Sequence, residues 1–214
     1  MTAALVLLAV QGMLGACDTL YFHEWKARLP ARVDRMRPEL QLHAVRSVIY
    51  GVLFCTLPWV AWTGPAAVLL AVLLAVEAVV TFTDFVVEDR VRVSLGGVYP
   101  GERVMHGVMA VVYGAFLAEL LPVLGDPLGD PAPAGLRLGL TALGVGSLLS
   151  GLRDGLVASG VHAAAWPWPP DPSSPVPQAA PAPATAEPAA PDPVASGPDG
   201  TSVDGGARRT TVPT

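Results

Sequence analysis

Five stretches of the 214-residue chain are long and apolar enough to cross the hydrocarbon core of a bilayer, which takes about 20 residues of helix. They cover residues 2–22, 40–62, 65–88, 103–122 and 136–158. The last is the weakest, because Arg153 and Asp154 interrupt its end and its glycines lower helix propensity. None of the five alternates apolar and polar residues as a barrel strand does, so the pattern predicts an all-α bundle of five transmembrane helices.

The composition agrees with a membrane location. Hydrophobic residues make up 52% of the chain and charged residues only 14%. No basic stripe with interleaved aromatic residues is present, which argues against a nucleic-acid partner. A phosphate-binding glycine loop, a nucleophile elbow and a cysteine-rich zinc pattern are also missing from the sequence. The sequence therefore predicts the lipid bilayer as surroundings, and it identifies neither a protein partner nor a catalytic residue.

Basic residues predict how the helices are oriented. They gather in the connections after the first and third spans, as Lys26, Arg28, Arg32, Arg35, Arg37, Arg90 and Arg92. The connections at 62–65 and 123–135 contain no lysine or arginine. The positive-inside rule then places the N-terminus outside and the C-terminus in the cytoplasm. The preference for arginine over lysine suggests a GC-rich bacterial genome, so we expect a multi-pass protein of the bacterial inner (plasma) membrane.

The last quarter of the chain has a different composition. Thirteen of the 22 prolines lie between Pro167 and Pro213, among alanine, serine and glycine. Such a segment cannot bury enough apolar surface to fold and favours polyproline-II conformations. We therefore expect a membrane domain at 1–163 and a disordered cytoplasmic tail at 164–214.

An internal repeat is suggested by the second and fourth spans. One begins PELQLHAVRSVIYG (38–51) and the other ERVMHGVMAVVYG (102–114). Each has a glutamate, a histidine four positions later, and Tyr-Gly seven positions after the histidine. The pattern predicts two tandem hairpins, 1–63 and 64–124, that form a four-helix core, with the fifth span (about 136–158) added to it.

Carboxylates and histidines recur toward the predicted cytoplasmic ends of the spans. On the third span one helical face carries Glu77, Asp84 and Glu88. The first span contributes Asp18, and His23 and Glu24 follow at its exit. With α-helical spacing Asp18 points well away from His23, so the two need not serve one site. A charge within a membrane costs at least about 2.5–3.5 kcal/mol, so such residues usually face the bundle interior and have partners.

One hypothesis is a metal centre. The predicted site resembles the two-ion site of the di-iron carboxylate bundles, in which two helices each supply a glutamate and two others a Glu/His pair. It departs from them in spacing, because its pairs have three residues between Glu and His instead of two. The ligands would be Glu24, Glu39, His43, Asp84, Glu88, Glu102 and His106, and the residues orienting them His23, Arg46, Tyr50 and Tyr113. Fe, Mn or Zn would suit these donors, acting in metal-assisted oxidation or hydrolysis of a lipid-soluble small molecule.

Two alternatives stay open at this point. Asp84 could pair with Arg46 or Arg103 and clasp the hairpins together, as in a non-enzymatic scaffold or membrane subunit. Glu39 and Glu102 would then simply occupy the first turns of their helices, where the helix dipole favours a carboxylate. The other alternative is a small transporter in which Glu77, near the middle of its span, carries protons or cations.

Overall fold

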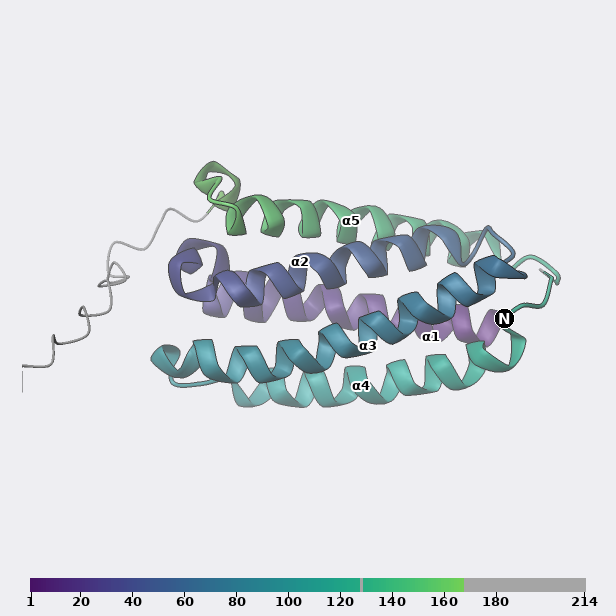
Figure 1. The fold of residues 1–214 in the computed structure, drawn as a ribbon, viewed down its shortest axis with the longest axis horizontal. Coiled ribbons are helices and arrows are strands. Elements are labelled where there is room, and N and C mark those ends of the chain that lie inside the picture. Colours follow the sequence, from purple (N-terminus) through teal and green to yellow (C-terminus); the bar gives the residue numbers. More distant parts are fainter. Residues whose placement is uncertain (128, 168–214) are drawn as a thin grey trace, which may run out of the picture. The chain divides into compact units, whose positions relative to one another are not determined.

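The computed structural model describes residues 1–127 and 129–167, which form a bundle of five long helices (Figure 1). The long helices are α1 (Thr2–Cys17), α2 (Val33–Thr56), α3 (Pro65–Val91), α4 (Pro100–Leu120) and α5 (Ala134–Ala158). Short 3-10 turns follow or precede them: η2 (Leu29–Arg32), η3 (Arg92–Leu95), η4 (Leu121–Val123) and η5 (His162–Ala165). Successive long helices run in opposite directions, and no strand occurs within the described ranges.

The described residues belong to one compact unit, Met1–Pro177. A second unit, Gln178–Thr214, lies outside the described residues. The predicted disordered tail therefore also lies outside them from residue 168 onwards.

Within the described part, four helices are long and apolar enough to cross a membrane: Thr2–Ala27, Pro65–Leu95, Pro100–Val123 and Ala134–Ala158. Large apolar side chains cover their outer surface, and Phe82 and Val111, for example, are 68% and 74% exposed. Charged and polar side chains are buried inside instead. An apolar exterior around a polar interior suits a bilayer, so the helices indicate a membrane protein and confirm the predicted all-α class.

The second predicted span differs most from expectation. The sequence predicts it at 40–62, but α2 begins at Val33 and ends at Thr56, and it is not among the four apolar helices. Charged residues, among them Glu39 and Arg46, lower its hydropathy. Pro38 lies inside α2, so Glu39 is not in the first turn as expected, whereas Glu102 does lie in the first turn of α4. Five spans and a tandem repeat stay predictions.

The first apolar helix changes its winding before it ends. After Cys17 it continues as a π-helix, η1 (Asp18–Ala27), in which residue i bonds to residue i+5. Residues five apart, such as Asp18 and His23, therefore lie about one turn apart. In an α-helix of 3.6 residues per turn they would point to different sides. The chain then reverses at Arg28, which has a left-handed backbone with φ of 51°.

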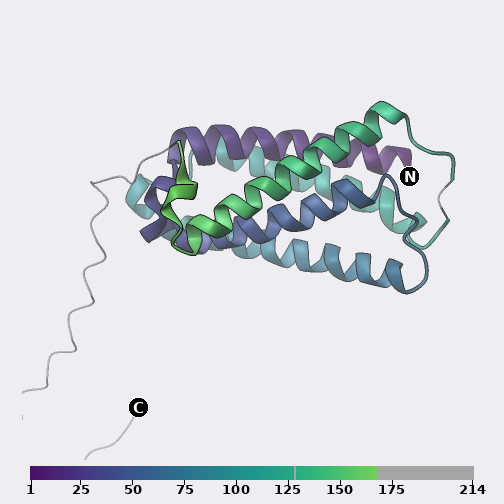
Figure 2. The same cartoon turned by 90° about the horizontal axis from the view of Figure 1, so that it is seen from above.

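The fifth helix packs closely against α2 and also contacts α1, at one side of the bundle (Figure 1). α5 makes its most extensive contact with α2, and Figure 2 shows it running obliquely across the other helices. Glycines permit this approach: a Cβ on Gly151 would lie 2.9 Å from the Ala44 carbonyl oxygen, and one on Gly144 3.1 Å from that of Gly51. The Ser147 hydroxyl also donates to the Ser47 carbonyl at 2.8 Å.

Candidate metal centre

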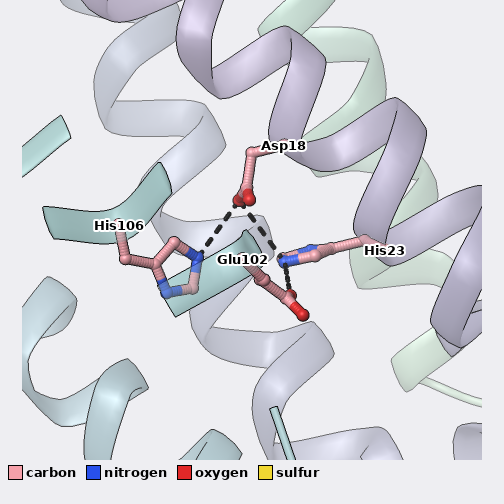
Figure 3. Close-up of side chains that lie close together, drawn as sticks. All are labelled: Asp18, His23, Glu102 and His106. Atoms are coloured by element: carbon pink, nitrogen blue, oxygen red, sulfur yellow. Dashed lines mark hydrogen bonds and ion pairs between the residues drawn. The ribbon is translucent and has the colours of Figure 1, made fainter. Parts of the chain in front are cut away.

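Four buried side chains converge between η1 and α4 (Figure 3). η1 supplies Asp18 and His23, and the first two turns of α4 supply Glu102 and His106. One nitrogen or oxygen atom from each lies within 4.8 Å of the corresponding atoms of the other three. We call these four residues the η1–α4 cluster, and the end of the bundle that contains it the polar end. The cluster could hold a metal ion.

The separations of the cluster atoms fit a bound ion. Asp18 Oδ2 lies 3.3 Å from His106 Nε2 and 3.5 Å from His23 Nε2. His23 Nε2 in turn lies 3.3 Å from Glu102 Oε1. A tetrahedral ion bound at about 2.0–2.2 Å holds its ligand atoms about 3.3–3.6 Å apart. The three close approaches therefore match the edges of such a coordination shell.

His23 has no hydrogen-bond partner among the described residues. It is 4% exposed, yet neither of its ring nitrogens makes a hydrogen bond. Its Nε2 faces the carboxylates of Asp18 and Glu102, but without hydrogen-bond geometry. A buried polar group left in this state costs roughly 1–3 kcal/mol. An ion between the imidazole and the two carboxylates would satisfy Nε2, the nitrogen that faces them.

His106 is held so that one nitrogen points at the cluster. Its Nδ1 lies 3.3 Å from Glu88 Oε1, and its ring stacks on Phe85 with centroids 5.1 Å apart. This leaves Nε2 beside Asp18. A carboxylate on the far nitrogen of a histidine commonly fixes the ring in metal sites and raises the basicity of the other nitrogen.

Arg92 links two glutamates at the polar end. Its side chain is fully buried, and Nη1 donates to both carboxylate oxygens of Glu102 at 2.6 and 2.7 Å. Its Nε lies 3.0 and 3.1 Å from the oxygens of Glu39, which Nη2 also contacts. The guanidinium thus ties the end of α3 to α2 and α4.

Buried carboxylates outnumber buried arginines among the described residues. Among the described residues two arginines are buried, Arg46 and Arg92. Seven carboxylates are buried: Asp18, Glu39, Glu77, Asp84, Glu88, Glu102 and Asp154. Ionised carboxylates in a low-dielectric interior are unfavourable unless a positive charge or protons accompany them. A divalent cation at the polar end would offset part of this excess.

Several predicted ligands have partners elsewhere. Glu24 forms an ion pair with Arg153, and Asp84 Oδ2 accepts a hydrogen bond from Arg46 at 2.6 Å. His43 Nδ1 lies 2.6 Å from an oxygen of Asp154, although its ring remains 4.8 Å from that of His23. The structure thus brings Glu102, His106 and Glu88 together and places these other three outside the cluster. The Arg46–Asp84 pair is one of the two that the clasp hypothesis proposes.

The predicted tyrosines lie deeper in the bundle. They follow His43 and His106 by seven residues, or about 10 Å of helix. Tyr50 accepts a hydrogen bond from Gln11 at 3.3 Å, and Tyr113 donates one to the Leu74 carbonyl at 3.4 Å.

Glu77, the proposed proton carrier, is 1% exposed. Thr81 donates to its Oε1 at 2.7 Å, whereas its Oε2 has no hydrogen-bond partner in the part of the chain that the structure describes.

Sequence reasoning missed three residues that the structure makes important. Asp18 was separated from His23 because α-helical winding was assumed, and only its position inside an apolar span marked it. Arg92 was assigned to a basic connection, and Asp154 was treated as an interruption of the last span. For Arg92 the one available signal was the matching positions of Glu39 and Glu102, which share it.

No protein-family model matches the chain, and neither the curated proteins nor the solved structures provide a match. The geometry of the η1–α4 cluster is therefore the basis for a function. The chain thus combines apolar helices that suit a membrane with a buried Asp/His/Glu/His group that could hold a metal ion.

Proposed function

We propose that the protein is an integral membrane metal-binding protein that holds one divalent transition-metal ion between η1 and α4. Asp18, His23, Glu102 and His106 supply the ligand atoms. The observation that carries the proposal is His23, a buried imidazole without hydrogen bonds whose Nε2 faces two carboxylates. The separations between ligand atoms and the Glu88 contact to His106 support it.

Two imidazoles and two carboxylates suit Fe, Mn or Zn, and the lack of a sulfur ligand argues against Cu(I). The di-iron resemblance implied two ions. We propose a single one, because among the described residues only Asp18, His23, Glu102 and His106 converge, whereas Glu24, Glu39 and Asp84 lie outside this group and each pair with an arginine. An arginine already supplies the positive charge that a second ion would bring. Glu102 also pairs with Arg92, but its Oε1 lies 3.3 Å from His23 Nε2 inside the cluster.

The membrane arrangement belongs to the same proposal. α2 has 24 residues, about 36 Å of helix, which is long enough to cross the membrane beside the four more apolar helices. The basic residues of the connection between α1 and α2 favour a cytoplasmic polar end in a bacterial plasma membrane. The proposed hairpin repeat is supported by its matching residues, since Glu39 and Glu102 both contact Arg92.

A scaffold or membrane subunit without metal is the second candidate. The observation that favours it is Arg92, whose two carboxylate partners come from different helices. The Arg46–Asp84 and Arg153–Glu24 pairs likewise join separate elements. In this case the cluster would only clasp η1 to α4.

Elemental analysis separates these candidates. The full chain is purified in detergent without chelators and loaded separately with Fe(II), Mn(II) and Zn(II). We expect one ion per chain with at least one of these metals. His23→Gln and Asp18→Asn should lose it, because each removes a ligand without removing an arginine partner.

The matched controls are His43→Gln and Glu77→Gln. Each changes a buried residue of the same type outside the cluster, so both should keep the ion. Folding is monitored by helical circular dichroism in every sample. A folded wild-type protein that takes up none of the three metals would overturn the metal proposal in favour of the scaffold. Retention of the ion by His23→Gln would also contradict it.

A further inference from the structure

A cavity of about 680 Å³ lies between α1, α2 and α5. Its walls come from residues 9–20, 43–54 and 135–150, together with Met109 of α4. The volume falls within the roughly 300–1,000 Å³ of sites for small organic ligands. Met13 and Leu20, which line it, are also strongly exposed on the apolar outer surface. The cavity therefore borders the surface that faces lipid.

The lining of the cavity changes from polar to apolar along the helices. Toward the polar end it contains Asp18, Thr19, His43, Arg46 and Ser47. Toward the other end it contains Ala9, Phe54, Leu136, Leu140 and Leu143. A ligand lying along the helices would thus place a polar head beside Asp18 and an apolar chain beside the leucines.

Three buried polar atoms of the lining have no hydrogen-bond partner among the described residues. They are Arg46 Nε, which donates, and Gln11 Oε1 and Asp18 Oδ1, which accept. All three residues are more than nine-tenths buried. Buried donors and acceptors are normally satisfied, so these atoms point to a ligand that both accepts and donates hydrogen bonds.

The charges of the lining favour an uncharged head. An anionic head would meet the Asp18 carboxylate, and Arg46 is already paired with Asp84 at 2.6 Å. A cationic head would meet the Arg46 guanidinium. Either charge would be buried beside a like charge, which is strongly unfavourable in a low-dielectric site.

Glycines create part of the space. A Cβ added to Gly139 or Gly146 of α5 would meet nothing within 4 Å, although both residues line the cavity. Because glycine has no side chain, both positions leave space beside α1, and no neighbouring atom packs into that space. A larger side chain at either position would therefore fill the cavity and leave the helix packing unchanged.

We propose that this cavity binds one uncharged single-chain lipid whose head carries hydroxyl or carbonyl oxygens. The head lies beside Arg46, Gln11 and Asp18, and the chain lies between α1 and α5. The inference rests on the proposed function in one respect: Asp18 belongs to both sites, so the head would lie next to the proposed ion. Binding itself does not require the ion, so the two proposals can fail separately.

Native mass spectrometry of the full chain in detergent tests the proposal. The probes are 1-oleoylglycerol, oleic acid and oleylamine, which share one chain and differ in head charge. We expect a one-to-one complex with 1-oleoylglycerol and weaker binding of both charged probes. Gly146→Leu should weaken the binding of 1-oleoylglycerol by about tenfold or more, equivalent to about 1.4 kcal/mol.

Gly107→Leu is the matched control. Gly107 lies on α4, also has nothing within 4 Å of an added Cβ, and does not line the cavity, so binding should be unchanged. Equal binding by Gly146→Leu and the wild type would overturn the proposal, as would a preference for a charged probe. A wild-type dimer that Gly146→Leu abolishes would mean that a second copy fills the cavity. Metal content, measured on the same samples, shows separately whether the protein binds the proposed ion.

Discussion

At the scale of single residues, Arg92 connects two glutamates of different helices at the polar end. It is fully buried and is the partner of both Glu39 and Glu102. Arg92→Met would leave two buried carboxylates without their positive partner. We expect a loss of about 3–5 kcal/mol in the free energy of unfolding, as when one member of a buried ion pair is removed. Titration with SDS from mixed micelles, followed by circular dichroism, measures it.

Arg103 provides the comparison for this prediction. It pairs with Asp89 at 2.7 Å, but both side chains are more than half exposed. Arg103→Met should change the free energy of unfolding by no more than about 1 kcal/mol, the usual range for exposed pairs. Similar losses of unfolding free energy in the two variants would show that burial does not determine how much Arg92 stabilises the fold.

The Arg46–Asp84 pair can be examined with a double-mutant cycle. Asp84→Asn leaves a buried guanidinium without its partner, and Arg46→Met leaves a buried carboxylate. We expect each single variant to be destabilised and the double variant to lose less than the sum of the two. The coupling should be about 0.5–3 kcal/mol, the range for residues in contact. Additive losses would mean that the pair does not clasp α2 to α3.

At the scale of helices, much of the fold could be predicted because lipid-facing surfaces are uniformly apolar. Hydropathy placed α3, α4 and α5 within three residues at each end. It placed α2 less well, since Glu39 and Arg46 of that helix point inward and periodicity cannot show what they pair with. For the candidate centre, Glu102 and His106 were predicted from helical spacing. The pairing of Asp18 with His23 depends on π-helical winding, for which the sequence contains no periodic signal.

The contact between α2 and α5 gives a prediction at the same scale. Gly151→Ala places a methyl group 2.9 Å from the Ala44 carbonyl oxygen, so the helices must separate. We expect a loss of about 1–3 kcal/mol in the free energy of unfolding, as for other overpacked sites. Thermal unfolding in detergent measures it.

The control lies one turn away on the same helix. A Cβ on Gly155 would meet only Ala44 Cβ, at 3.8 Å, which is an ordinary contact. Gly155→Ala should therefore be neutral or stabilising by up to about 1 kcal/mol, because alanine favours helix. Equal destabilisation by the two substitutions would contradict close packing at Gly151.

At the scale of the whole molecule, the proposed orientation can be tested from outside the cell. Thr63 and Ser94 are exposed and lie near opposite ends of α3. In a variant lacking Cys17 and Cys55, we expect a membrane-impermeant maleimide to label Thr63→Cys in intact cells. Ser94→Cys should react only after the membrane is permeabilised, because the basic polar end faces the cytoplasm.

The reverse labelling pattern would show that the polar end lies outside. In that case the proposed metal ion would have to come from the extracellular side. Labelling of both variants in intact cells would contradict a membrane-spanning α3. Each variant is also labelled in detergent, which establishes that its thiol is reactive.

The π-helix has a consequence for how such a centre can arise in evolution. A π-turn contains one residue more than the α-turn it replaces, so an in-frame insertion of a single codon is enough to produce it. An ancestor with Asp18 and His23 four positions apart on an ordinary α-helix would already have had both on one face. Insertion of one codon between them would keep the two side chains on one face and rotate the following part of the helix about its axis. The insertion would thus keep the cluster geometry while changing the direction in which the chain reaches the turn at Arg28.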